Sequence, residues 1–193
     1  LGEARAVGAQ SVFSPDGRYG ALDRNSSITI EAINDEVDPI DVSLLAYAPD
    51  MPWISLMTWD NDSQRVAAGM GSLLRSSPVP IMVIDTEGNI LYELSGGLHM
   101  IDYLLWSADN QFLLAIDRAN QIMIYDMQSG EQVIASQAYT LVGEGLAWSP
   151  DGTQLAIGDT INSVTVWDLV TQVPTYTLPR NDSVVSRIQW QTT

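Results

Sequence analysis

The sequence contains no cysteine and no lysine, and it has a single histidine, His99, among 193 residues. The absence of cysteine excludes disulfides and thiolate metal sites, and it leaves the redox compartment undetermined. The absence of lysine excludes a Walker-type phosphate loop. Acidic residues outnumber arginines by 24 to 8, which gives a formal net charge of −16. We therefore expect no unassisted binding to nucleic acid or to an anionic membrane surface, because both need clustered cations.

Long hydrophobic runs are also missing. No stretch of about 18 consecutive apolar residues occurs, so the sequence predicts no membrane-spanning helix and no membrane insertion. The chain starts at Leu1 rather than at methionine and lacks the order of basic, apolar and small residues that marks a signal peptide. We expect a start that was processed or built differently, or a piece of a longer chain. With 46% hydrophobic residues, the chain can fold around a core.

A repeat runs through the chain. Aromatic residues recur at intervals of 42 to 47 positions, and the first four precede turn sequences such as Ser-Pro-Asp-Gly. An alternating apolar run that ends in an acid follows each of these four in phase. The aromatic residues are Phe13, Trp59, Trp106, Trp148 and Trp190, and the runs end at Glu31, Asp85, Asp126 and Asp168. Such a period is typical of four-stranded units, and no capped helical pattern interrupts it. The sequence therefore predicts an all-β fold, and we expect five tryptophans in its core: Trp59, Trp106, Trp148, Trp167 and Trp190.

These motifs resemble those of the WD-repeat β-propeller family, over nearly the whole chain. The unit from Leu146 to Leu178 carries the resemblance best, because it combines Trp-Ser-Pro-Asp-Gly with Val-Thr-Val-Trp-Asp. TolB-like propellers share the Ser-Pro-Asp-Gly turn and are the close alternative. The Gly-His pair that family members often have before the first strand is absent, so we do not expect the buried hydrogen-bond network that depends on that histidine.

The resemblance implies blades of four antiparallel strands at about 8–47, 52–94, 99–137 and 143–178, with an additional strand at 184–191. Family propellers usually have more blades, and an arc of four leaves apolar faces uncovered. Three explanations stay open. The chain could be part of a longer propeller, it could be completed by a partner or by a second copy of itself, or it could close as a small ring.

Residue patterns for catalysis and metal binding are weak. A Ser–His–acid site would need His99, and the sequence has no Gly-x-Ser-x-Gly motif around a nucleophile. The run from Asp60 to Asp62 begins like a calcium loop, but Arg65 and Gly71 stand where that loop needs glycine and glutamate. We therefore expect no catalytic residue, no metal and no cofactor, and we predict that the protein is not an enzyme.

Candidate contact residues for a partner lie in the expected loops. Asp23-Arg24 and Asp117-Arg118 occupy the same turn of two units, on a face that binds partners in the family, and arginine is common at binding hot spots. Trp53 lies outside the repeat register and is interpreted as a loop aromatic. His99 lies in a loop before a first strand. The predicted contact residues are Arg24, Trp53, His99, Asp117 and Arg118.

The leading functional hypothesis is a non-catalytic scaffold for protein–protein interaction. One alternative is a subunit of a larger, possibly membrane-associated complex whose partner completes the propeller, either as a homodimer or as a heteromer. A more remote alternative is a ligand-binding or enzymatic propeller, for which one histidine and no lysine offer little support. The resemblance favours an intracellular location over a periplasmic or extracellular one, although the turn motif permits both.

Overall fold

The structure of the protein is a computed structural model that describes residues 11–24, 26–35, 37–47, 53–71, 80–95, 99–136, 145–158, 163–178, 185 and 187–191. Strands and turns make up these residues, and none of them forms a helix. Consequently, the described part of the chain contains no helix long and apolar enough to cross a membrane.

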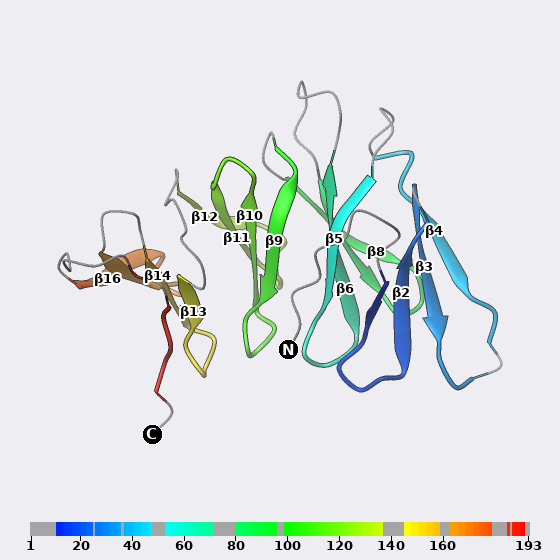
Figure 1. Ribbon diagram of the computed structural model, residues 1–193, viewed down its shortest axis with the longest axis horizontal. Coiled ribbons are helices and arrows are strands. Elements are labelled where there is room, and N and C mark those ends of the chain that lie inside the picture. The colour runs from blue at the N-terminus through cyan, green and yellow to red at the C-terminus, as the bar shows by residue number, and fades with distance from the viewer. Residues whose placement is uncertain are drawn as a thin grey trace. The chain divides into compact units, whose positions relative to one another are not determined.

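Sixteen strands form four antiparallel sheets of four strands each, so the all-β prediction is confirmed (Figure 1). The strands of each sheet follow one another in chain order. The first sheet contains β1 (Ser11–Phe13), β2 (Tyr19–Asp23), β3 (Ser27–Ala32) and β4 (Ile40–Ser43), and the second contains β5 (Trp53–Trp59), β6 (Arg65–Gly71), β7 (Ile81–Asp85) and β8 (Ile90–Leu94). The third contains β9 (Ile101–Trp106), β10 (Phe112–Asp117), β11 (Ile122–Asp126) and β12 (Gln132–Ser136), and the fourth contains β13 (Leu146–Trp148), β14 (Gln154–Gly158), β15 (Val164–Asp168) and β16 (Val173–Leu178).

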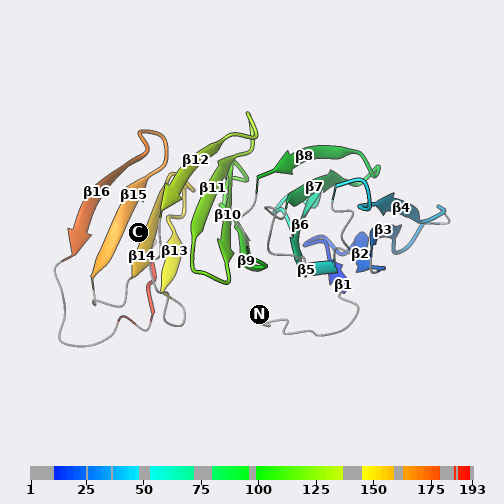
Figure 2. The same ribbon diagram turned by 90° about the horizontal axis from the view of Figure 1, so that it is seen from above.

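The chain divides into two compact units, Leu1–Leu104 and Leu105–Thr193, each of which is described by itself. In the first unit, β1 contacts β5, and these strands lie side by side in Figure 2. The core of this unit packs one face of the first sheet against the second sheet. Its fully buried members include Ala21, Ile28, Val66, Ala68 and Met82, all 0% exposed.

The second unit has its own core, in which β10 and β11 pack against β14. Leu114, Ile122, Ile124 and Leu155 are each 0% exposed there. The ring of Phe112 stacks on that of Trp148, with centroids 6.4 Å apart. Alternation along β14 directs Leu155 and Ile157 into this core, and it directs Ala156 to the opposite face of the fourth sheet.

Three expectations need comment. Trp53 begins β5 as a half-buried strand residue, so its interpretation as a loop residue is wrong. Of the five tryptophans expected in the core, Trp59 and Trp106 are 6% and 4% exposed, whereas Trp148, Trp167 and Trp190 are only partly buried. The structure assigns no strand element to the described residues of 184–191, where Arg187 forms an isolated β-bridge.

Candidate interaction surface

The turn between the first and second strands has the same construction in three of the four sheets. A serine hydroxyl donates to the aspartate two residues later and accepts the backbone N–H five residues later. The Ser–Asp distances are 2.7 Å for Ser14–Asp16, 2.6 Å for Ser107–Asp109 and 2.5 Å for Ser149–Asp151. The backbone donors are Tyr19, Phe112 and Gln154, at 3.0, 2.9 and 2.9 Å. These bonds hold the side chains at the end of each sheet in fixed positions.

The second sheet replaces the serine with Asp60, which is 1% exposed. Its Oδ1 accepts the backbone N–H groups of Gln64 and Arg65 at 2.8 and 3.1 Å, and its Oδ2 accepts the guanidinium Nε of Arg65 at 2.8 Å. The short run from Asp60 to Asp62 is therefore a tight turn, as the sequence predicted. A buried carboxylate is acceptable here because a cation and two backbone donors compensate its charge.

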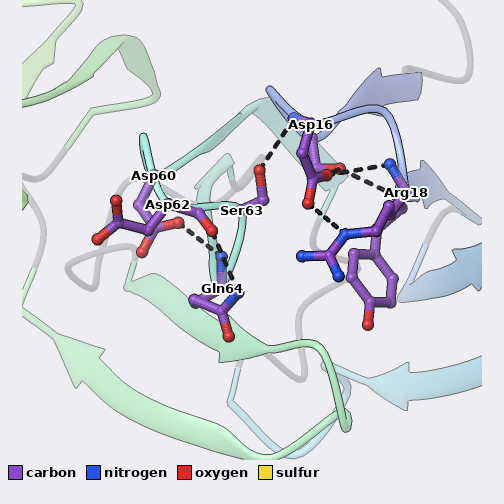
Figure 3. Close-up of polar contacts among 8 residues, drawn as sticks. Asp16, Arg18, Asp60, Asp62, Ser63 and Gln64 are labelled. Carbon is purple, nitrogen blue, oxygen red and sulfur yellow. Dashed lines mark hydrogen bonds and ion pairs between the residues drawn. The ribbon is translucent and has the colours of Figure 1, made fainter.

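Neighbouring turns contact each other within each unit. In the first unit, the backbone N–H of Asp16 donates to the Ser63 hydroxyl at 3.1 Å (Figure 3). In the second unit, the Asp109 carboxylate lies directly against Gly152, where an added Cβ would lie 2.4 Å from Asp109 Oδ1. Each pair of turns therefore forms one continuous polar surface.

The first of these surfaces carries fixed charges. Asp16 accepts the Arg18 backbone N–H and the Ser14 hydroxyl, and it pairs with the Arg18 guanidinium, so its pKa lies well below its usual range. Asp16 in turn raises the pKa of Arg18. The Arg18 side chain is nevertheless 66% exposed. Because only its Nε is needed for the pair with Asp16, the outer edge of this guanidinium can meet a partner (Figure 3). Sequence analysis missed Arg18, although its place directly after Pro-Asp-Gly was a usable signal.

The predicted contact residues Arg24, Asp117 and Arg118 lie in turns at the other end of the second strands. Arg24 is exposed, and no ion pair joins its guanidinium to any described residue. Its turn is fixed by bonds from Arg24 N to Ser27 O at 2.9 Å and from Leu44 N to Ser26 O at 2.8 Å.

The corresponding turn of the third sheet differs by one residue. Asp23 pairs with Ile28 inside its ladder, whereas Asp117 follows the last paired residue, Ile116. Asp117 is 1% exposed and uses Oδ1 to accept the N–H groups of Ala119 and Gln121, both at 2.9 Å. Its carboxylate therefore shapes the turn and is not available to a partner. Arg118 and Ala119 are the exposed residues of that turn.

Trp53 and His99 lie away from both arginine-bearing turns in the sequence. The Trp53 ring covers Gly71, where an added Cβ would lie 2.5 Å from Trp53 Cε2. His99 is half-buried at a bend before β9. Neither the Trp53 contact with Gly71 nor the position of His99 indicates a catalytic role. The described residues contain no group of three or more His, Asp or Glu side chains placed to hold a metal ion.

Comparison with known proteins shows several relatives of the same type. No protein-family model matches the sequence. The WD repeat-containing protein slp1 of Schizosaccharomyces pombe is 26% identical over 172 residues, which cover 88% of this chain and 32% of slp1. The APC/C activator protein CDC20 of Saccharomyces cerevisiae is 27% identical over 152 residues, covering 78% of this chain and 24% of CDC20. The chain thus spans a third or less of these relatives.

Solved structures share the fold at lower identity. The C-terminal WD40 domain of Sif2 matches with a TM-score of 0.72 and 16% identity, over 94% of this chain and 51% of that one. A chain of the mitotic checkpoint complex matches with a TM-score of 0.62 and 20% identity, over 93% of this chain and 52% of that one. The repeated four-stranded sheets and these matches together show that the chain has the WD40 β-propeller type of fold and is similar in sequence to WD-repeat proteins.

Proposed function

We propose that this chain is a non-catalytic scaffold that binds other proteins through the turns at the ends of its sheets. Two of the similar proteins carry names that describe interactions: an activator of the APC/C and, in Caenorhabditis elegans, an actin-interacting protein that is 27% identical over 120 residues, or 60% of this chain and 19% of its own length. Protein binding also suits this chain, because its turns are held by hydrogen bonds between side chains and backbone.

The observation that carries the proposal is the state of Arg24. Its side chain is exposed and has no ion pair among the described residues, although the whole protein carries a net charge of −16. The loop around it is fixed by backbone hydrogen bonds, so little conformational entropy is lost when a partner binds there. A guanidinium in this setting suits a carboxylate-bearing peptide, because it can make a bidentate pair. Arg118 is a second exposed arginine, in the turn of the third sheet, and it already has a contact within the chain.

The test is selection from a displayed random-peptide library against the immobilised 193-residue chain. We expect acidic peptides to be enriched, and we expect this enrichment to be lost in the double variant Arg24→Ala/Arg118→Ala. Arg18→Ala is the matched control, because it removes an exposed arginine at the opposite end of β2.

Two results would remove this surface from the proposal. One is enrichment of the same peptides by the wild type and the double variant. The other is loss of enrichment only in Arg18→Ala, which would move the contact to the Asp16–Arg18 turn. Circular dichroism of each variant separates loss of contact from loss of fold.

A further inference from the structure

A second fixed turn lies beside the turn that contains Arg24. Leu44 follows β4 and is 0% exposed, and its backbone N–H donates to the Ser26 carbonyl at 2.8 Å. The N–H of Tyr47 donates to the Leu44 carbonyl at 3.1 Å, which places Leu45 at the corner of a β-turn. Leu44 thus anchors this turn in the core and joins it to the Arg24 turn.

The anchored turn presents apolar side chains to water. Leu45 and Tyr47 are 53% and 36% exposed, although hydrogen bonds fix the backbone around them. Burial of such side chains by a partner removes apolar area from water and costs little ordering of the backbone. An apolar contact is therefore available next to the guanidinium of Arg24.

Arg24 and Leu45 belong to the same face of the first sheet. Ala21 on β2, Val42 on β4 and Leu44 are members of the core of the first unit. Because successive side chains of a strand point to opposite faces, Arg24 and Leu45 point away from that core. Strands β2, β3 and β4 lie side by side in Figure 1, so the ends of β2 and β4 are separated only by β3.

A row of polar residues connects the two ends. The Arg24 N–H donates to the Ser27 carbonyl at 2.9 Å, and Ser27 pairs with Ser43 on β4. Arg24 and Ser43 are thus two strand spacings apart, or about 10 Å. An extended peptide rises about 3.3 Å per residue, so it crosses this row in about three residues. Arg24, Ser27, Ser43, Leu45 and Tyr47 are called the Arg24–Leu45 surface below.

Charge distinguishes the two ends of this surface. Asp41 lies two residues before Ser43 on the same face of β4, where it is exposed and accepts the hydroxyl of Thr29. Its carboxylate repels a second carboxylate that approaches Leu45. The Arg24 end therefore suits an acidic residue, and the Leu45 end suits an uncharged apolar one.

We propose that the Arg24–Leu45 surface binds an extended acidic segment of a partner protein that carries an apolar residue three positions from an Asp or Glu. The acid pairs with Arg24, and the apolar side chain packs on Leu45 and Tyr47. This inference rests on the proposed function, because it uses the same arginine, and it adds a second anchor and a spacing. A second copy of this chain is a poor occupant, because two copies with a net charge of −16 repel each other.

The test is selection from a displayed peptide library that has Asp fixed at its centre and random residues elsewhere. The immobilised chain carries Arg118→Ala, so that Arg24 is the arginine under test. A second library with Asn at the centre measures the preference for the acid. We expect Asp to be preferred over Asn, and we expect Leu, Ile, Met and Phe to be enriched several-fold three positions from the Asp. Acids should be depleted at that position.

Leu45→Ser should abolish the apolar enrichment and keep the preference for Asp over Asn. Leu91→Ser is the matched control, because Leu91 is 42% exposed on β8 of the same unit, and it should change neither preference. A selected peptide, synthesised and titrated by fluorescence anisotropy, should bind Leu45→Ser about tenfold more weakly, as expected when one leucine contact is lost. Circular dichroism of each variant confirms that the fold is kept.

The two proposals fail in different ways. No preference for Asp in the chain with Leu45 intact would remove the proposed function and this inference together. A preference for Asp without the apolar enrichment would overturn this inference alone, as would an apolar enrichment that survives Leu45→Ser. Sedimentation of the wild-type chain should show a monomer. A dimer that Leu45→Ser abolishes would assign the surface to a second copy and would also overturn the inference.

Discussion

The indole N–H of Trp59 donates to the backbone carbonyl of Val12 at 3.1 Å and so joins the first strands of two neighbouring sheets. Trp59 is 6% exposed, and its ring stacks on that of Tyr19 with centroids 6.1 Å apart. The bond satisfies a polar group on each side of a packed apolar interface. Replacement of the indole by a phenyl ring removes this bond together with part of the packing.

Trp59→Phe is expected to destabilise the first unit by about 1–2 kcal/mol or more, because the Val12 carbonyl loses its indole donor and the smaller ring packs less fully. Urea unfolding, followed by a probe placed in the first unit, measures the effect. A loss near zero would mean that the Val12 carbonyl finds another donor.

Trp167→Phe is the informative counterpart. Its indole nitrogen is buried, and no residue that the structure describes accepts a hydrogen bond from it. Removing that donor relieves a desolvation penalty of about 1–3 kcal/mol. The smaller phenyl ring loses some packing, which offsets part of this gain in stability. We expect unfolding midpoints in urea at or above that of the wild type, in contrast to Trp59→Phe. A clear loss of stability would show that the indole nitrogen is satisfied in solution.

Two glycines with the same backbone conformation should respond differently to alanine. Gly17 has φ of +72° with nothing within 4 Å of an added Cβ, whereas Gly152 has φ of +75° and lies against Asp109. Gly17→Ala should cost about 1 kcal/mol, from the left-handed backbone alone. Gly152→Ala should cost roughly 1 kcal/mol more, because Asp109 must leave the bonds that it accepts from Ser107 and Gln111.

Thermal unfolding of both glycine variants, in the wild-type and Asp109→Ala backgrounds, tests this difference. The additional cost at Gly152 should disappear when Asp109 is absent. Its persistence would place the obstruction in the backbone rather than in the carboxylate.

Asp151 makes the stability of the fourth sheet depend on pH. The Ser149 hydroxyl, followed by the Thr153 N–H, lowers the pKa of Asp151. Because the folded pKa lies below the unfolded value of about 3.9, this carboxylate stabilises the fold above roughly pH 4. That stabilisation is lost as the pH falls through the folded pKa.

Ser149→Ala should therefore raise the pKa of Asp151 toward its ordinary value, as measured by carboxyl NMR titration. Asp168 provides the control in the same sheet, because its lowered pKa comes from the backbone N–H and hydroxyl of Thr171. A shift at Asp168 of equal size would indicate a general loosening instead of a lost bond.

Asp60 and Arg65 should behave as a coupled pair. Asp60→Ser restores the serine of the other turns but removes the carboxylate that Arg65 pairs with, so it should cost roughly 2 kcal/mol. The double change Asp60→Ser/Arg65→Gln copies Ser149 and Gln154 of the fourth sheet and should lie close to the wild type. A double-mutant cycle measured by urea unfolding gives the coupling. Additive costs would contradict it.

Much of the fold could be predicted because residues close together in the sequence form each repeated turn. Asp and Gly at fixed places fold each turn without help from distant residues, so the four-stranded sheets follow from spacing alone. Even there, the left-handed position is Gly17 or Gly152 in two turns but Ser63 and Asn110 in the others, with φ of 62° and 59°. A pattern based on glycine alone would have found only half of these turns.

What the sequence did not reveal depends on contacts between distant residues. Trp53 reads as a loop residue because β5 has an irregular register between Ile54 and Leu56, which breaks the simple alternation. Asp117 reads as a surface residue because acids are usually exposed, but its turn places it under the chain. The contact of Asp109 with Gly152 joins two turns 43 positions apart, and no local rule predicts it.

The exposed tyrosine and leucine of β16 give the protein an unusual dependence on salt. Electrostatic repulsion between copies with a net charge of −16 extends about 30 Å at 0.01 M salt but only about 3 Å at 1 M. At low ionic strength, this repulsion keeps the exposed Tyr176 and Leu178 side chains of different molecules apart. Concentrated sulfate removes the repulsion and strengthens apolar association at the same time. The colloidal stability of the chain should therefore be highest in dilute buffer.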